Sequence, residues 1–365
     1  MGNTTTPSTP KVKHREVASA LRRAIDSGAW RVGERLPGEQ ELARRHRVSQ
    51  MTIRQAVANL VEEGVLIRIR GKGTYLVPEE DRRELRDDGQ AMTLLFPDDA
   101  QQRDPYYFPE VLEGFQHGLE DAGRRAAMLP VEMAERFGLV GPRGAVACLL
   151  FKEHHTQLIE GLRDSGLKVL AINRYVGRRS IPCVRIDDAG GIESAVEHLT
   201  ALGHERIGFV RGLPANIDAA DRLRGFREAV KRFGVRYAPE AGDGFAEAAG
   251  YAAAQELLSL PQRPSAIVCA SDLSALGAVK AAHDLGISVP RGLSVVGFGD
   301  FSVADYMLPG LTTIRQSRLA LGRSAAQALV ELAAGAEVAD VVLSAELIVR
   351  GSTAENIARP MAAVK

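Results

Sequence analysis

The chain has little of what marks a secreted, membrane-embedded or disulfide-linked protein. Its 365 residues hold three cysteines, Cys148, Cys183 and Cys269, each among apolar neighbours. An odd, small number of such cysteines is typical of reduced, buried packing residues in a cytosolic protein. No apolar run reaches the roughly 18 residues of a membrane span. Residues 1–10 are rich in Thr and Pro and lack the apolar core of a signal peptide, so we expect a disordered tail there.

Signatures of catalysis and metal binding are also scarce. The chain has no Gly-x-Ser-x-Gly elbow and no phosphate-binding loop. His154 and His155 are adjacent, which is poor geometry for two ligands of one metal, and we expect an exposed pair. His198 and His204 lack acidic or Cys partners at metal-ligand spacing. We therefore expect no catalytic residues, no metal and no cofactor, and a protein that is not an enzyme.

The chain also lacks net charge, because 46 Lys and Arg balance 46 Asp and Glu. The balance hides an uneven distribution. Residues 11–78 hold 14 Lys and Arg and 7 Asp and Glu, a net charge of +7, so the rest of the chain carries −7. A basic segment ahead of a larger acidic body indicates binding of a polyanion such as DNA.

The basic segment has the pattern of three helices and a hairpin. A helix through Val17–Ile25 ends near Gly28, and Pro37 introduces a short second helix. The third helix starts at an N-cap, Ser49, and ends at Gly64, with one apolar stripe formed by Ile53, Ala56, Val57, Leu60 and Val61. Residues 65–75 alternate as a hairpin with Gly71-Lys72-Gly73 at its tip. This order predicts a winged helix-turn-helix domain over residues 11–78; the alternative is a small helical domain whose arginines are merely solvated.

The body alternates strands and helices. Residues 79–91 are charged and nearly free of apolar anchors, which predicts a linker. Beyond it we expect strands at 92–96, 145–151, 168–172, 206–211, 266–270 and 293–298, and helices at 110–123, 189–202, 220–233, 273–285 and 318–334. Such alternation predicts an α/β fold with parallel sheets, and the length favours two lobes over residues 92–350, followed by a C-terminal tail at 351–365.

Polar residues stand where several predicted strands end. They are Asn173-Arg174, Ser271-Asp272 and Gly299-Asp300. Ligands of open α/β sheets bind in the crevice at the carboxyl ends of the strands, so these positions predict a small-molecule site. Two alternatives remain open: Ser271 or Asp272 caps the next helix, and Asn173 is a turn residue.

The N-terminal segment resembles the DNA-binding domain of the gluconate-repressor (GntR) family. The resemblance covers residues 13–77 and is carried by RLPGEQELA at 35–43, VSQMTIRQAV at 48–57 and GKGTY at 71–75. It implies contacts with operator DNA from Gln40, Ser49, Gln50, Thr52, Arg54, Arg70, Gly71 and Lys72. The family usually has Arg at the positions of Gln40 and Gln50. Because Arg is the usual bidentate reader of guanine whereas Gln suits adenine, we expect an operator that depends less on guanine there.

The body resembles the effector domain of lactose-repressor-type (LacI/GalR) regulators, which is similar to periplasmic sugar-binding proteins. The resemblance covers residues 92–350 and is carried by AVEHLTALGHERIGF at 195–209, DRLRGF at 221–226, Ser271-Asp272 with ALG at 275–277, SVVGFGD at 294–300 and LTTIRQ at 311–316. It implies two Rossmann-like lobes joined by three crossovers, a periplasmic-binding-protein-like (type I) fold.

The same resemblance implies an effector site in the cleft between the lobes. Its expected residues are Tyr107, Phe108, Asn173, Arg174, Arg222, Phe245, Ser271, Asp272, Asp300 and Gln316. Relatives commonly have Asp at the positions of Asn173 and Gly299, and Asn at that of Ser271. These departures make a plain pentose or hexose less certain than in the family, and favour a sugar acid or phosphate drawn to Arg174 and Arg222.

Together the two resemblances imply a ligand-responsive transcription factor, similar in architecture to arabinose-type repressors. We expect a cytoplasmic, nucleoid-associated bacterial homodimer that binds operator DNA and a sugar, sugar acid or sugar phosphate, without a membrane partner. The alternatives are a sugar-binding protein of the transport type and an enzyme that uses the cleft. The missing signal peptide and the basic head argue against the first, and the missing acid, base or lysine signature argues against the second.

Overall fold

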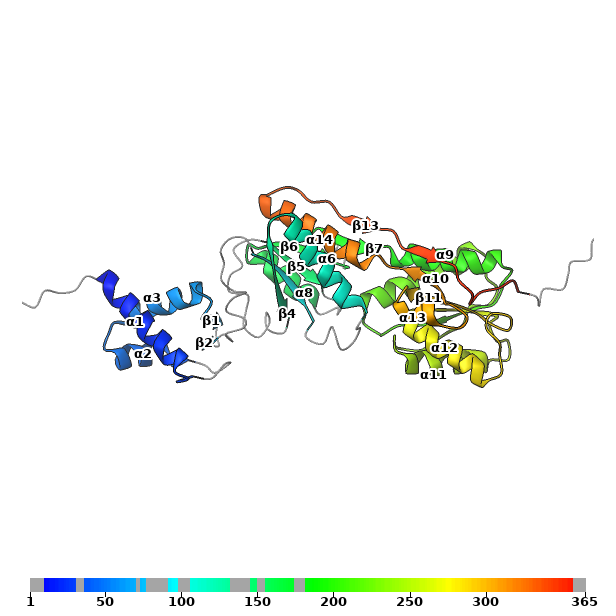
Figure 1. Cartoon of the computed structure of the whole chain (residues 1–365), viewed down its shortest axis with the longest axis horizontal. Coiled ribbons are helices and arrows are strands. Elements are labelled where there is room, and N and C mark those ends of the chain that lie inside the picture. Colours follow the sequence, from blue (N-terminus) through cyan, green and yellow to red (C-terminus); the bar gives the residue numbers. More distant parts are fainter. Residues whose placement is uncertain are drawn as a thin grey trace, which may run out of the picture.

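The computed structural model describes residues 10–30, 36–69, 73–76, 91–97, 106–131, 145–149, 155–173 and 181–356. The described part contains a small N-terminal domain and two larger α/β lobes (Figure 1). In that part of the chain, no helix has both the length and the apolar character needed to cross a membrane.

The N-terminal domain has the predicted order of three helices and a hairpin. Its elements are α1 (Pro10–Asp26), α2 (Glu39–His46), α3 (Gln50–Glu62), β1 (Leu66–Ile69) and β2 (Gly73–Leu76), with β1 antiparallel to β2. The apolar stripe of α3 packs with α1 and α2 around Leu21, Leu42, Ile53 and Leu60. Ser49 caps α3 by accepting the Thr52 amide at 3.2 Å. The predicted winged helix-turn-helix is confirmed, except that Gly73 pairs with Ile69 in the ladder and so is not a tip residue.

The first lobe is a six-stranded parallel sheet in the order β13-β7-β6-β5-β3-β4. Its strands are β3 (Ala91–Phe96), β4 (Arg125–Pro130), β5 (Ala145–Leu149), β6 (Lys168–Ile172), β7 (Cys183–Ile186) and β13 (Val341–Leu343). One apolar core joins the sheet to α6 (Tyr107–Asp121) and α14 (Arg318–Ala334). A second core joins it to α8 (His155–Asp164). The near-continuous apolar strands follow from this burial on both faces.

The second lobe repeats the plan in the order β14-β12-β11-β10-β8-β9. Its strands are β8 (Ile207–Val210), β9 (Glu240–Ala241), β10 (Ala266–Cys269), β11 (Ser294–Gly299), β12 (Thr312–Arg315) and β14 (Glu346–Ile348), and β14 alone among them runs antiparallel to its neighbour. Helices α9 (Asp188–Ala201) and α10 (Ile217–Arg232) share one core, and α11 (Glu247–Leu258) and α12 (Asp272–Asp284) share the other. The short α13 (Ser302–Tyr306) follows β11.

The chain passes between the lobes three times. It enters the second lobe between β7 and α9, returns between β12 and α14, and leaves again between β13 and β14. The predicted α/β class, two lobes and three crossovers are therefore confirmed. A change in the angle between the lobes must alter the backbone conformation of the residues at these crossings.

Glycines set the spacing of the helices that cover the first sheet. A Cβ at Gly114 on α6 would lie 2.2 Å from the carbonyl oxygen of Leu319, and one at Gly322 on α14 would lie 2.2 Å from that of Val111. The two helices thus touch backbone to backbone. Any side chain at either position forces them apart, because a backbone carbonyl cannot move aside cheaply.

The structure corrects two expectations, the C-terminal boundary of the body and the exposure of His155, and confirms a third, the burial of the cysteines. The body extends beyond residue 350, because Ser352 is fully buried and its hydroxyl accepts the Thr312 amide at 2.8 Å and donates to the Val295 carbonyl at 2.6 Å. His155 is buried rather than exposed, since it faces the core side of α8, and His154 lies outside the described residues. The three cysteines are buried and unbridged, as predicted; burial raises the pKa of the Cys148 thiol to about 12.

Candidate functional site

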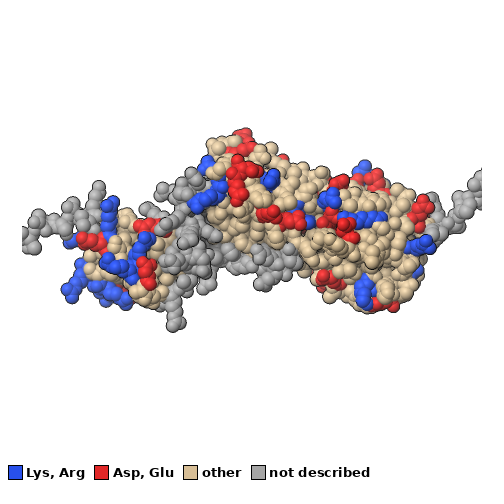
Figure 2. All heavy atoms as spheres, viewed as in Figure 1, with Lys and Arg blue, Asp and Glu red and all other residues tan. Residues whose placement is uncertain are grey.

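The predicted DNA-contacting residues share the exposed surface of α2 and α3. Gln40, Gln50 and Arg54 are exposed, and the hydroxyls of Ser49 and Thr52 lie 2.9 Å apart at the start of α3. Basic side chains gather over this domain in Figure 2. The remaining predicted contacts, Arg70, Gly71 and Lys72, lie outside the described residues.

Arg54 is held in place by an acidic residue that the sequence did not single out. Its Nε and Nη2 atoms both donate to Oε2 of Glu39, at 3.1 and 3.0 Å. Glu39 is the first residue of α2, so this pair ties α2 to the middle of α3. The guanidinium remains largely exposed, with a side-chain exposure of 61 %. Glu39 therefore fixes the direction of Arg54 without removing it from the surface.

A buried polar cluster joins the second lobe to two crossovers. Arg222 on α10 donates from Nε to the Asp188 carboxylate at 3.3 Å, and Gln316 donates from Nε2 to the other Asp188 oxygen at 3.0 Å. Asp188 begins α9 directly after the first crossing, and Gln316 follows β12 at the second. The structure thus brings two predicted residues, Arg222 and Gln316, to one unpredicted carboxylate.

The Arg222 guanidinium lies over two aromatic rings. Its central carbon lies 3.9 Å from the centroid of Phe298 and 5.6 Å from that of Phe245. Its Nη1 donates to the carbonyl of Ala270, at the end of β10, at 2.7 Å. Such cation–π contacts strengthen when the cation is desolvated, as Arg222 is. Phe245 thus lies beside Arg222, and its stacking on a ligand stays a prediction.

Asp188 and Arg222 compensate each other's charge. Burial is the largest influence on the Asp188 carboxyl and raises its pKa, while Arg222 and the Gln316 hydrogen bond oppose that rise. We take the pair as ionised, because the guanidinium cannot give up its proton in a protein and needs a counter-charge when buried. The buried cluster then has no net charge but is strongly polar.

In the first lobe, Tyr107 and Asn173 contact each other. The Asn173 side-chain amide donates to the Tyr107 hydroxyl, and its oxygen accepts the Ile186 amide at 3.4 Å. Asn173 has φ 55, a left-handed conformation at the end of β6, so its role as a turn residue is confirmed. Phe108 is buried in the core of the first lobe, with its ring edge-on to Tyr107. Arg174 lies outside the described residues.

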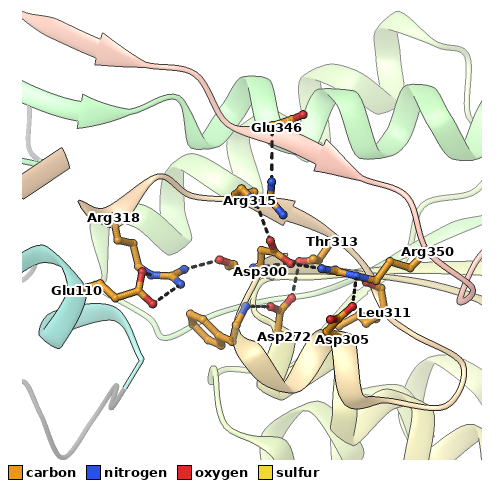
Figure 3. Close-up of polar contacts among 12 residues, drawn as sticks. Glu110, Asp272, Asp300, Asp305, Leu311, Thr313, Arg315, Arg318, Glu346 and Arg350 are labelled. Carbon is orange, nitrogen blue, oxygen red and sulfur yellow. Dashed lines mark hydrogen bonds and ion pairs between the residues drawn. The ribbon is translucent and has the colours of Figure 1, made fainter. Parts of the chain in front are cut away.

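Ser271 caps the helix that follows β10, as the alternative interpretation held, and Asp272 is the first residue of that helix. Ser271 caps α12 in a reciprocal capping box with Ser274 and also donates to the Phe245 carbonyl at 2.6 Å. Asp272 accepts the Thr313 hydroxyl and the Phe301 amide, the latter at 2.7 Å (Figure 3). Both side chains thus have hydrogen-bond partners within the second lobe, and their contact with an effector stays a prediction.

The buried Asp272 carboxyl makes stability depend on pH. Burial raises its pKa from 3.8 to about 6, against the two hydrogen bonds it accepts. A carboxyl whose folded-state pKa is raised stabilises the fold below its unfolded pKa, and this contribution is lost as pH rises through the folded value. The relevant window runs from about pH 4 to about pH 6.

Asp300, the residue after Gly299, is paired with two arginines. Its two oxygens pair with Nε of Arg315 at 2.7 Å and Nη2 of Arg350 at 2.8 Å, as Figure 3 shows. Asp300 has φ 51, a left-handed backbone conformation that is uncommon for a residue other than glycine. The Asp300 carboxylate thus links β12 and the segment after β14, and its contact with an effector stays a prediction.

Two contacts that the sequence did not predict cross between the lobes. The rings of Tyr106, which precedes α6, and Phe301, which follows β11, stack with centroids 5.0 Å apart. Arg318 at the start of α14 donates to both Glu110 oxygens, at 3.0 and 2.9 Å, and to the Gly299 carbonyl (Figure 3). The first lobe is thus tied to the second at the turn after β11.

Comparison with protein families agrees with this division of the chain. Residues 13–76 match the model of bacterial regulatory proteins of the gntR family, and residues 196–353 match a periplasmic binding protein-like domain. The chain joins a GntR-type DNA-binding domain to a periplasmic-binding-protein-like domain. Both predicted resemblances are confirmed.

Two of the curated relatives that this chain is similar to are named as transcriptional repressors. The chain is 29% identical to the arabinose metabolism transcriptional repressor of Geobacillus stearothermophilus, over 94% of this chain and 98% of that repressor. It is 37% identical to the HTH-type transcriptional repressor CytR of Escherichia coli (strain K12), over 53% of this chain and 58% of that repressor.

Solved structures share the fold of the body. A LacI family transcriptional regulator from Mycobacterium smegmatis superposes with a TM-score of 0.62 at 29% identity, over 73% of this chain and 99% of that one. The lac repressor dimer bound to operator and an anti-inducer superposes with a TM-score of 0.65 at 23% identity, over 76% and 99%, which shows the likeness of fold alone.

Proposed function

We propose that this chain is a transcriptional repressor of carbohydrate-utilisation genes, with operator binding that responds to a small effector held between the lobes. The observation that carries the proposal is the polar cluster of Asp188, Arg222 and Gln316, two members of which lie at crossovers. A ligand bound there acts on the segments that set the angle between the lobes. The relative named as an arabinose metabolism transcriptional repressor supports the same conclusion, and a second relative is named as a transcriptional repressor.

In the proposed mechanism, a homodimer in the bacterial cytoplasm presents two α3 helices to the half-sites of a pseudo-palindromic operator. Effector binding changes the angle between the lobes, and the linker passes this change to the two heads. The effector shifts the population only by the difference between its affinities for the two states. We expect it to relieve repression.

The charge of the cluster favours a neutral effector. Arg222 is buried against Asp188, two rings and a carbonyl oxygen, so it offers no uncompensated positive charge to a phosphate or carboxylate. A polyhydroxylated sugar exchanges hydrogen bonds with the carboxylate, guanidinium and amide without adding a charge. We therefore favour a neutral sugar or sugar derivative over the sugar acid or phosphate that the sequence suggested.

A gel-shift experiment with the DNA upstream of the protein's own gene tests the proposal. We expect a specific shift that neutral sugars release and that the matching sugar acids and phosphates release only at far higher concentration. The Arg54→Ala variant should lose the shift, whereas the Arg224→Ala control, which removes an exposed arginine from the body, should keep it. Absence of any sequence-specific shift contradicts the proposed function, and release by anionic sugars alone contradicts the proposed effector class.

The operator itself offers a second test. Gln40 and Gln50 are exposed on the α2 and α3 surface where the family usually has arginines. We expect operator selection followed by single-base substitution to show adenine preferred over guanine opposite these residues. An undiminished guanine requirement at both positions would refute this assignment.

A further inference from the structure

Met51 is an exposed apolar residue at the functional end of α3. Its exposed fraction is 76 %, and among the large apolar residues that stand exposed in the described ranges it is the one in the N-terminal domain. The opposite face of the helix is fully buried through Ile53 and Ala56. A single exposed apolar side chain is ordinary on a protein surface, so its position on the helix must carry the argument.

The position is the first turn of α3, directly after the Ser49 cap. Met51, Arg54 and Gln55 are three and four residues apart, so they lie on one face of the helix, and all three are exposed. Glu39 fixes the direction of Arg54 on that face. Met51 is therefore the apolar member of a row of polar side chains at the end of the helix that enters the major groove.

The major groove presents one apolar group to such a residue, the C5-methyl of thymine. The thioether side chain is unbranched and adaptable, which suits contact with a methyl group at the floor of a groove. We propose that Met51 is a specificity-determining residue that contacts a thymine methyl in each operator half-site, an inference that rests on the proposed function of this domain. Met51 thus complements the hydrogen-bonding readers Gln50 and Arg54 by selecting thymine through shape.

Replacement of thymine by uracil tests the contact because it removes the methyl group and nothing else. Each thymine of a selected operator is replaced by deoxyuridine, and affinities are measured for the full-length chain. We expect one symmetric position at which uracil weakens binding by the wild type about fourfold per half-site, the effect of one buried methyl-sized group. The Met51→Ala variant should bind the thymine operator less tightly and show no further loss with uracil there.

Two controls separate the contact from a loss of folding. Met51→Leu keeps an apolar side chain of similar volume and should retain the uracil effect. Leu285→Ala, a truncation of an exposed apolar residue on the body, should leave both affinity and uracil effect unchanged. If the operator is bound specifically, two results overturn this inference alone. One is an equal uracil effect in the wild type and in Met51→Ala, and the other is the absence of a uracil effect at every thymine. Absence of specific binding overturns the proposed function together with it.

Discussion

Removal of the Arg222 charge should destabilise the body strongly, because it leaves the Asp188 carboxylate buried without a counter-charge. In Arg222→Met the side-chain volume is largely kept, while the bonds from Arg222 to Asp188 and to the Ala270 carbonyl are lost. Breaking a buried ion pair by removing one partner typically costs about 3–5 kcal/mol. Gln316 still donates to Asp188 but supplies no charge, so we expect a loss within that range.

The matched variant removes both charges. In Asp188→Asn/Arg222→Met the asparagine oxygen can still accept from Gln316, and no buried charge remains. Replacing a buried pair by neutral groups is often close to neutral for stability, so we expect the double variant to lie within about 1 kcal/mol of the wild type. The double variant should therefore be at least about 2 kcal/mol more stable than Arg222→Met. The single variant Asp188→Asn completes the double-mutant cycle, from which the coupling free energy of the pair is obtained.

The single tryptophan supplies an internal reference for this measurement. Trp30 packs against the core of the N-terminal domain, so its fluorescence follows that domain, while the circular dichroism of the chain is dominated by the larger body. In urea titrations, Arg222→Met should lower the midpoint seen by circular dichroism and leave the fluorescence transition in place. A loss below about 1 kcal/mol with no coupling to Asp188 would refute the buried pair and, with it, the argument for a neutral effector.

Three other expectations concern separate parts of the chain. Burial raises the pKa of Asp272 to about 6, so the wild type should lose stability as pH rises from 4 to 7. In urea titrations its free energy of unfolding should fall by about 2 kcal/mol over this range relative to that of Asp272→Asn. The same pH dependence in both proteins would contradict the raised pKa. Gly322→Ala should lower the free energy of unfolding by about 1–3 kcal/mol, because the added Cβ pushes α14 away from α6. The control Gly161→Ala adds a Cβ in open space on a helix and should leave the free energy of unfolding unchanged or raise it by about 0.5–1 kcal/mol. Equal effects of the two variants in urea titrations would contradict the close packing. Glu39→Gln should weaken operator binding less than Arg54→Ala and leave effector affinity unchanged, as measured by gel shift and calorimetry.

The sequence predicted the elements whose patterns are local. The apolar stripe and N-cap of α3 are properties of one short segment, and the predicted helix at 318–334 matches α14 residue for residue. The helix α11 was not predicted. Its face toward α12 consists of Ala and Gly, which allow the two backbones to come close together, and these small residues weaken the apolar periodicity of α11. Short strands such as β7 and β12 were missed since three or four buried residues carry no period.

The candidate site was predicted only where a residue lies in a recognisable motif. Arg222 and Gln316 were found in this way, but their shared partner Asp188 follows another aspartate at a helix start, where an acidic residue is expected in any case. The partners of Asp300 were not predicted, because they are arginines 15 and 50 residues further along the chain. Such long-range pairings leave no local trace in the sequence.

In the proposed mechanism, an effector bound between the lobes controls whether the N-terminal domain binds operator DNA. The most direct test is the affinity of the full-length chain for its effector, measured by calorimetry with and without saturating operator DNA. Linkage requires that operator and effector change each other's affinity by the same factor. We predict that operator DNA weakens effector binding by about 5–150-fold, the range of typical allosteric coupling. An effector affinity that is identical with and without a specifically bound operator would contradict the account.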